Sequence, residues 1–296
     1  MGRIIFKQRP ADTVTIIFLL FLLILTLVFY QHIPKAPFLI SLYSILVIAQ
    51  IILIRFKDSG RFMGGFYDII FPIICVLVIF DSLEWLVHYV NPEDIDPILI
   101  RLDYLIFNNH PTVILERIMS PLLTDMLQIA YSTYYFIPIS FGISLLLNNQ
   151  KKEFNRSLFL IIFCFYLSYL GYILMPALGP RFTINHDTEL QGLFITEPIQ
   201  RLLNRLEGIK RDAFPSGHTA VALTVLYLSY RFKRRFFWIS LPVVSALIFS
   251  TVYCRYHYVV DIIAGFGLMF LTILFGEWYY AWWLKWSLRN GRGERI

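Results

Sequence analysis

Apolar runs of about 20 residues recur along almost the whole chain, and they limit the possible folds more than any other feature. The hydrocarbon core of a bilayer is about 30 Å thick, so a helix needs about 20 apolar residues to cross it. Only helices and closed barrels satisfy their backbone hydrogen bonds in that environment. The chain has 296 residues, of which 57% are hydrophobic and 16% are charged. We therefore predict an all-α integral membrane protein with about eight transmembrane helices.

The predicted spans follow one another through short connections rich in Lys, Arg or Pro. The first is too long for a signal-peptide core and no small-residue cleavage site follows it, so we expect it to be retained. A stretch with several prolines, residues 91–122, is expected to hold short helices at the membrane interface. The predicted spans are residues 13–30, 38–54, 67–90, 123–147, 157–175, 217–230, 236–253, and 256 onward to an aromatic cluster at 278–286.

The spans and the basic residues together predict the organisation and the orientation. We expect two N-terminal transmembrane helices in residues 1–66, a membrane-embedded domain of six core helices in residues 67–284, and a basic cytoplasmic tail in residues 285–296. Seventeen of the 26 Lys and Arg lie at the two termini and after the second, fourth and sixth spans. Cytoplasmic loops carry the excess of these residues, so both termini should be cytoplasmic. The long loop at residues 176–215 then faces the periplasm, the exterior or an organelle lumen.

The start of the sixth span has the pattern of an anion-binding helix terminus. It reads Pro215-Ser216-Gly217-His218, where Ser216 is a good N-cap and Gly217 lets an anion approach the backbone. Free N–H groups and the positive end of the helix dipole favour phosphate there. His218 adds a proton donor that titrates near neutral pH. The competing interpretation is an ordinary capped helix with a surface histidine.

The turn between the last two spans carries a second polar group on the same outward side. His257 and Asp261 are four residues apart, so they lie on one face of a helix. A carboxylate at this position fixes the histidine tautomer and leaves the other ring nitrogen free, as a nucleophile or a base requires. Arg255 adds a permanent cation suited to phosphate. The competing interpretation is a structural ion pair at a membrane surface.

Two further polar features lie on the outward side. Arg181 follows a stiff Pro-Gly-Pro stretch at the end of the fifth span, where it binds phosphate or simply anchors the interface. Asp81, Glu84 and His88 fall at i, i+3 and i+7 near the end of the third span. Charged groups within a span are costly and often functional, so these three either line an acceptor pocket or form an internal polar network.

The chain resembles the type 2 phosphatidic acid phosphatase superfamily, whose motifs are Lys-x6-Arg-Pro, Pro-Ser-Gly-His and Ser-Arg-x5-His-x3-Asp. The second motif is matched in full by residues 215–218, and the third by Ser250, His257 and Asp261. Thr251 stands at the arginine position of the third motif, and Leu174 at the lysine position of the first. The patterns Tyr-x3-Pro-x2-Gly-Pro-Arg and Arg-x-His-Tyr-x2-Asp are similar to the branch that contains inositol phosphorylceramide synthases and related inositol phosphotransferases.

The resemblance implies a role for each of these residues. His257 would attack phosphorus and become a phosphohistidine, Asp261 would orient it, and His218 would protonate the leaving oxygen and then activate the acceptor. Arg181, Ser216, Gly217 and Arg255 would hold the phosphate oxygens, with Arg255 replacing the cation absent at Thr251. The implied substrate is a phospholipid or isoprenoid phosphate, which the domain at residues 67–284 cleaves without a metal or other cofactor.

Other functions predict other patterns. A transporter would place its polar groups near the bilayer midplane and show repeat symmetry, whereas the polar groups here gather at one surface. A vanadium-dependent haloperoxidase would resemble a soluble protein with the full set of phosphate-binding cations. No basic face with interleaved aromatic residues lies outside the predicted spans, so we do not expect nucleic acid as a partner. The three cysteines are far apart and imply neither a disulfide framework nor a metal cluster.

Overall fold

The computed structural model describes residues 8–206 and 209–289, and within them every regular element is a helix. Seven helical stretches there are long and apolar enough to cross a membrane, which confirms the predicted all-α membrane fold. They are α2 (Pro10–Val28), α3 (Ala36–Phe56), the stretch Arg61–Trp85, the stretch Pro121–Leu147, α11 (Lys151–Leu174), α15 (Arg234–Tyr253) and α16 (Val259–Arg289). The chain is therefore an integral membrane protein with several spans.

The sixth predicted span is a shorter helix than its neighbours. It forms α14 (Gly217–Phe232), which has 16 residues and is therefore about 24 Å long. This is less than the thickness of the bilayer hydrocarbon core, about 30 Å. α14 packs against α11, α15 and α16, so neighbouring helices surround its apolar side chains. It therefore lies in the interior of the bundle, where length matters less than packing.

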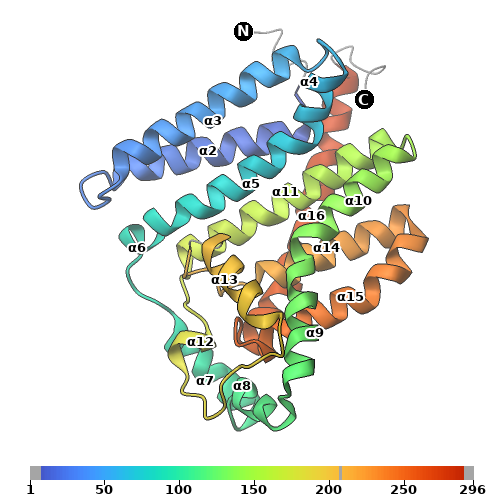
Figure 1. Ribbon diagram of the computed structural model, residues 1–296. Helices are drawn as coiled ribbons and strands as arrows, with labels where there is room; N and C mark the ends of the chain where they lie inside the picture. The colour runs from blue at the N-terminus through green and yellow to red at the C-terminus, as the bar shows by residue number, and fades with distance from the viewer. Residues whose placement is uncertain (1–7, 207–208, 290–296) are drawn as a thin grey trace.

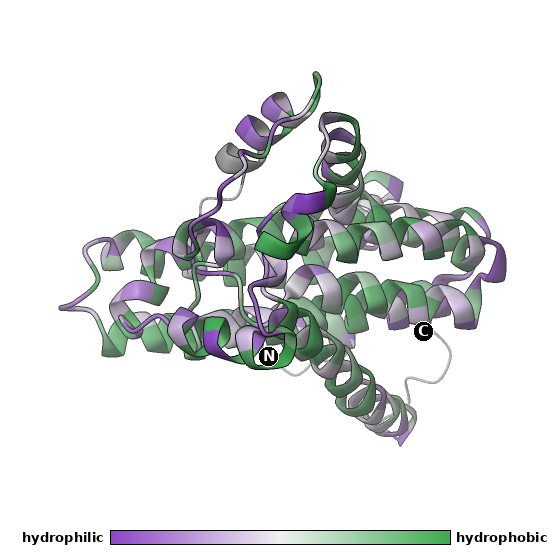
Figure 2. Cartoon of the chain, turned by 90° about the horizontal axis from the view of Figure 1, so that it is seen from below, coloured by the Kyte–Doolittle hydropathy of each residue, from purple (hydrophilic) through white to green (hydrophobic). Residues whose placement is uncertain are grey.

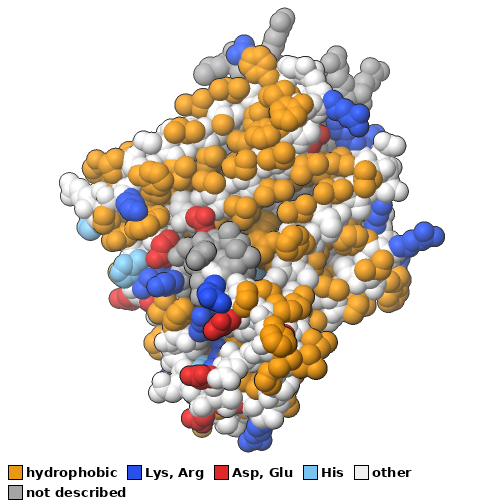
Figure 3. Space-filling model, in the orientation of Figure 1, with side chains coloured by type: hydrophobic (Ala, Val, Ile, Leu, Met, Phe, Trp, Pro, Cys, Tyr) orange, Lys and Arg blue, Asp and Glu red, His pale blue; other side chains and the backbone are white. Residues whose placement is uncertain are grey.

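Helix α11 is the centre of the bundle. It contacts α2, α10, α14 and α16, and two thirds of its most apolar window is buried inside the molecule. Figure 1 shows α2, α3 and α5 (Phe71–Ser82) running along one side of α11, with α14 and α15 on the other. Figure 2 shows hydrophobic residues along the long helices and hydrophilic residues near their ends. In Figure 3 hydrophobic side chains cover most of one face, as expected for helices surrounded by lipid.

Prolines explain where two of the long stretches bend. Pro138 has no N–H to donate to the carbonyl of Tyr134, and there the chain changes from α9 (Pro121–Ser132) through a 3₁₀ turn into α10 (Phe136–Leu147). Figure 1 shows the direction changing between α9 and α10. Pro72 similarly follows a π-helical turn at Phe66–Ile70, between α4 (Arg61–Gly65) and α5. Tyr131 at the end of α9 and Tyr134 in the 3₁₀ turn, which lie at the first bend, are both buried.

Short helices gather at one end of the bundle, and the start of α2 and the end of α16 lie at the other (Figure 1). The stretch at residues 91–122 forms the expected short helices, followed later by two more in the long loop. These elements are Leu83–Trp85, α6 (Val87–Val90), α7 (Asp96–Phe107), α8 (Pro111–Ile114), Leu115–Ile118, α12 (Pro180–Thr183) and α13 (Thr196–Leu206). The long loop and the starts of α14 and α16 are thereby brought to the same end.

Most helix boundaries differ from the predicted spans by a few residues, and three of the differences affect the predicted organisation. The third stretch begins at Arg61, so the expected domain boundary at residue 66 falls inside helical structure. α11 begins at Lys151, which places Lys151 and Arg156 in its first turns rather than after the preceding helix. α16 continues to Arg289, while residues 290–296 of the predicted tail lie outside the described part. In each case a polar first or last turn extends the apolar run.

Candidate active site

The N-terminus of α14 forms as the sequence predicts. The Ser216 hydroxyl accepts the N–H of Thr219 at 3.3 Å and donates to the Thr219 hydroxyl at 3.0 Å. Gly217 follows without room for a side chain, because a Cβ there would lie 2.2 Å from the Tyr172 hydroxyl. The Tyr172 hydroxyl therefore lies against Gly217 in the first turn of α14, at the positive end of the helix dipole.

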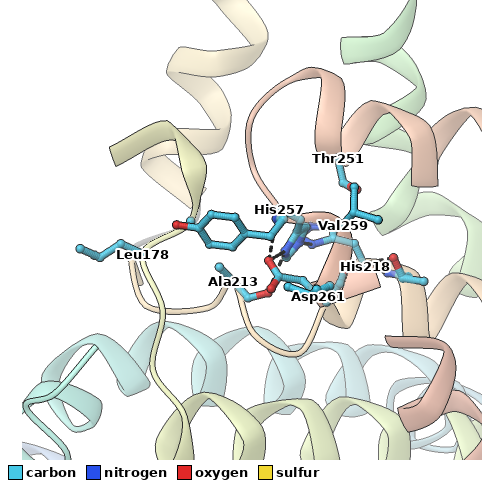
Figure 4. Close-up of polar contacts among 12 residues, drawn as sticks. Leu178, Ala213, His218, Thr251, His257, Val259 and Asp261 are labelled. Atoms are coloured by element: carbon cyan, nitrogen blue, oxygen red, sulfur yellow. Dashed lines mark hydrogen bonds and ion pairs between the residues drawn. The ribbon is translucent and has the colours of Figure 1, made fainter. Parts of the chain in front are cut away.

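The two predicted catalytic histidines lie in direct contact. Nδ1 of His218 is 3.2 Å from Nε2 of His257, and both side chains are buried. Nδ1 of His257 lies 2.8 Å from the carbonyl oxygen of Ala213 and 3.4 Å from Oδ2 of Asp261 (Figure 4). A carbonyl only accepts, so this nitrogen carries the proton and Nε2 keeps its lone pair. The arrangement supplies one unprotonated ring nitrogen beside a second histidine, within reach of one phosphate.

The start of α16 is tied to the start of α14. Asp261 accepts the N–H of Tyr258 on Oδ2 at 2.8 Å, and its backbone carbonyl accepts the N–H of Ser216 at 3.1 Å. The helices also cross closely, since a Cβ on Gly265 would lie 2.8 Å from the Ser216 carbonyl oxygen. Two residues 45 positions apart in the sequence, Ser216 and Asp261, are thus held together by a backbone hydrogen bond.

Aromatic rings surround His218. Its ring centroid is 4.7 Å from that of Tyr131 and 4.3 Å from that of Tyr134. Tyr131 in turn stacks on Tyr256, whose hydroxyl accepts a hydrogen bond from Gln128 at 2.9 Å. The rings exclude water from one side of the histidine pair and limit the rotation of His218. The Nε2 atom of His218 is buried and makes no hydrogen bond within the described structure.

A backbone hydrogen bond joins the two predicted phosphate-binding arginines. The N–H of Arg181 donates to the carbonyl of Arg255 at 2.9 Å. Arg255 has a left-handed backbone, with φ 66°, and its guanidinium donates to Glu116 at 3.1 Å and to the carbonyl of Thr188. Burial lowers the pKa of Arg255, and the Glu116 charge opposes that shift. The two cations differ in exposure, because Arg181 is exposed whereas Arg255 is largely buried beside Glu116.

Thr251 and Leu174 occupy the two positions where the family motifs have a cation, and the structure shows what each contributes instead. Thr251 is fully buried, and its carbonyl accepts the N–H groups of Tyr256 and His257. It therefore shapes the turn before His257 with its backbone. Leu174 is 59% exposed at the end of α11, where it contributes apolar surface. Neither position supplies a charge to the site.

The three predicted acceptor residues are spread over three elements. Asp81 lies exposed in the last turn of α5, Glu84 lies in the following 3₁₀ turn, and His88 is exposed in α6. Glu84 accepts the backbone N–H of Lys210 at 3.2 Å, which places it against the loop that leads to α14. The same loop contains Asp212, whose pKa burial raises to about 6, with a further contribution from Glu84. Glu84 thus contacts this loop, whereas the ring of His88 packs against the ring of Tyr89.

Two buried carboxylates on α7 support the site, and the sequence prediction missed both. Asp103 accepts the N–H groups of Val259 and Val260, each at 3.0 Å, and so caps α16. Asp96 accepts the N–H groups of Leu178 and Gly179 and the Tyr258 hydroxyl, at 2.7–2.9 Å. The carboxylates are seven residues apart and therefore share one helix face. That spacing was a usable signal, although it does not reveal which helix is capped.

Comparison with known proteins identifies a family whose sequences this chain resembles. The model of the PAP2 superfamily matches residues 98–275. A PA-phosphatase related-family protein of Dictyostelium discoideum is 23% identical over 197 residues, which cover 59% of this chain and 36% of the relative. A phosphoinositol dihydroceramide synthase of Bacteroides thetaiotaomicron is 27% identical over 165 residues, which cover 51% of this chain and 54% of the relative.

The aligned part of the chain spans about a third of the first relative and about half of the second. No solved structure matches. Within the described residues no group of three His, Cys, Asp or Glu is arranged to hold a metal ion. The family model covers more than half of the chain and includes both histidines and Asp261; the chain therefore belongs to the PAP2 superfamily.

Proposed function

We propose that this protein is a membrane enzyme that cleaves a lipid phosphoester through a phosphohistidine on His257. The observation that carries the proposal is the histidine pair, in which Nε2 of His257 faces Nδ1 of His218 at 3.2 Å. The contact of Nδ1 of His257 with the Ala213 carbonyl leaves Nε2 as the nucleophilic atom. A pair of this kind divides one difficult displacement into two easier steps.

In the first step Nε2 of His257 attacks phosphorus, and the bond from phosphorus to the lipid oxygen breaks. His218, in its protonated form, gives a proton to that oxygen. In the second step an acceptor hydroxyl gives its proton to His218 and attacks phosphorus, which releases His257. The N-terminal N–H groups of α14, with Arg181 and Arg255, would hold the phosphate oxygens.

We further propose that the acceptor is an alcohol rather than water, so that the enzyme transfers a phosphate-containing head group. The uncharged positions Leu174 and Thr251 depart from the phosphatase motif, and one relative carries the name phosphoinositol dihydroceramide synthase. Glu84 and Asp212 are the acidic side chains best placed to accept hydrogen bonds from a hydroxylated group, since the loop before α14 joins them. The site would face away from the cytoplasm, because the connections rich in Lys and Arg lie at the opposite end of the bundle from the histidine pair.

Purified protein incubated with phosphatidylinositol or with lipid phosphates, with and without dihydroceramide, tests both proposals. Head-group transfer predicts a new lipid that needs the alcohol, whereas a phosphatase predicts free phosphate without it. During turnover an acid-labile, base-stable phosphoryl label should appear on wild type and be absent from His257→Ala. His218→Ala should still form label from a substrate with a good leaving group. His32→Ala, on the exposed turn after α2, serves as the control, and label that survives in His257→Ala would overturn the assignment.

A further inference from the structure

An apolar groove of about 190 Å³ runs along α11, between α5 and α10. α11 packs against both of these helices, so it forms the floor of the groove and they form its walls. The lining is hydrophobic along almost its whole length, and several of its side chains, such as Leu77 and Ile143, are also partly exposed on the outer surface. The groove is therefore open toward the position of the surrounding lipid.

One end of this groove is the active site. Its lining includes His218 and Asp212, and the aromatic side chains Tyr134 and Tyr172 lie beside them. Tyr134 packs on the ring of His218, and the Tyr172 hydroxyl lies against Gly217. His218 also has the buried Nε2 atom without a hydrogen-bond partner. The groove is thus continuous with the histidine pair and with the phosphate-binding helix terminus.

The other end of the groove is charged. Asp68 lines it there and accepts a hydrogen bond from the guanidinium of Arg9 at 2.8 Å, with the ammonium of Lys151 at 3.9 Å. Arg9 is itself buried and also pairs with Asp12. Methylene groups gain nothing by packing against such a cluster, because the charges would lose solvation. The charged cluster is therefore a boundary for an apolar ligand.

The length of the groove fits one hydrocarbon chain. Phe80, at the active-site end, and Asp68 are twelve residues apart on one helical stretch, or about 18 Å. An acyl chain that begins at a phosphate beside His218 would thus end near Asp68.

We propose that this groove binds one hydrocarbon chain of the lipid substrate, and that the cluster around Asp68 sets an upper limit to the chain length. The proposal rests on the proposed function, because it assumes a lipid phosphoester at the histidine pair. The groove then limits the length of the bound chain, because each added methylene gains apolar burial only until the chain reaches the charged end. Rates should rise with chain length and then stop rising.

A larger side chain at Gly142 should shorten the groove. It lines the groove on α10, eight residues or about 12 Å beyond Tyr134, and a Cβ there would lie 3.4 Å from the Phe154 ring. A leucine at this position would fill the groove beyond its middle. Gly267→Leu is the matched control, since Gly267 lies on the exposed face of α16 and a Cβ there would meet nothing within 4 Å. Ile73→Trp blocks the groove from the opposite wall, in case Gly142→Leu folds poorly.

The first experiment measures kcat/KM for alkyl phosphates of six and sixteen carbons, with an alcohol acceptor present and each variant in mixed micelles. We expect Gly142→Leu and Ile73→Trp to lose at least about tenfold on the long substrate while rates on the short one stay within about twofold. Gly267→Leu should match wild type on both. Equal losses on the two substrates in both groove variants would overturn the proposal.

The second experiment does not depend on turnover. A sixteen-carbon alkyl phosphate with a diazirine at the far end of its chain is bound to wild-type protein and photolysed. We expect crosslinks on the parts of α5 and α10 near Ile73 and Gly142, which Gly142→Leu displaces. Crosslinks confined to the outer faces of α15 and α16 would overturn the groove. Crosslinks in the groove without turnover of any lipid would instead refute the proposed function and leave the chain-binding site standing.

Discussion

The ring of His257 is oriented by a backbone carbonyl as well as by a carboxylate. Its Nδ1 lies 2.8 Å from the Ala213 oxygen and 3.4 Å from Asp261 Oδ2. A side-chain substitution at Asp261 leaves the carbonyl in place, so the tautomer that exposes Nε2 should persist. The carboxylate then contributes mainly negative charge, which stabilises a positively charged ring, and the hydrogen bond to the N–H of Tyr258.

Asp261→Asn should therefore lower turnover by about ten- to a hundredfold, the range for losing a supporting partner of a functional histidine. When the carboxylate alone fixes the tautomer, the same change costs about ten-thousandfold, as in the serine protease triad. Steady-state rates of the purified variant, with its melting temperature as the control for folding, distinguish the two cases. A loss near the larger figure would show that the Ala213 carbonyl does not fix the tautomer.

Asp212→Asn should change stability in a pH-dependent way. Burial raises the pKa of Asp212 from 3.8 to about 6, so between these values the folded state binds more protons than the unfolded state. The unfolding free energy of wild type therefore falls as pH rises through that window. The asparagine variant lacks this fall and should gain about 1 to 2 kcal/mol relative to wild type between pH 4 and pH 7. Thermal melts at both pH values measure it, and an equal difference at both would contradict the assignment.

At the scale of elements, the site depends on how closely α16 crosses α14. Gly265→Ala should lower activity by about tenfold or more, because its Cβ would lie 2.8 Å from the Ser216 carbonyl and push Asp261 away from the α14 terminus. Gly267→Ala, two residues along the same helix, meets nothing within 4 Å and should behave as wild type. Rates of the two variants at equal expression provide the comparison. Equal activity in both would mean that the crossing tolerates a wider separation.

The sequence predicts some parts of this arrangement and not others. The order Ser216, Gly217 and His218 indicates a capped helix start because capping is local, and the His257–Asp261 spacing indicates a shared face for the same reason. The ion pair of Arg255 with Glu116 joins residues 139 positions apart, and no local pattern indicates it. Asp103 on α7, which caps the start of α16, is a similar case. The face of α7 on which it lies was predictable, but the identity of the helix that it caps depends on tertiary packing.

At the scale of the whole molecule, apolar runs locate the spans because lipid requires them, whereas span ends depend on long-range pairs. Arg156 illustrates the difference: it follows a run of basic residues in the sequence, yet it lies within α11 and pairs with Glu277 on α16. The bend at Pro138 was not predicted, since residues 123–147 were expected to form one span, and the packing of Tyr134 on His218 was not predicted either. Packing of several helices decides such features.

The two ends of the bundle should label from opposite sides of the membrane. Asp187 and Lys152 are exposed at opposite ends, in the long loop and at the start of α11, and the three native cysteines are buried. Asp187→Cys should react with an impermeant maleimide in intact cells, and Lys152→Cys only after permeabilisation, because basic loops stay in the cytoplasm. The reverse pattern would place the active site on the cytoplasmic side.

Because the substrate groove opens through the side of the bundle, the enzyme should respond to the concentration of substrate within the membrane. A lipid can move from the bilayer into the space between α5 and α10 by lateral diffusion, with its chain never crossing water. The relevant quantity is then the mole fraction of substrate in the surface, not the number of moles per litre. Diluting the substrate with inert detergent or lipid would slow the reaction even in an unchanged volume, and adding buffer would not.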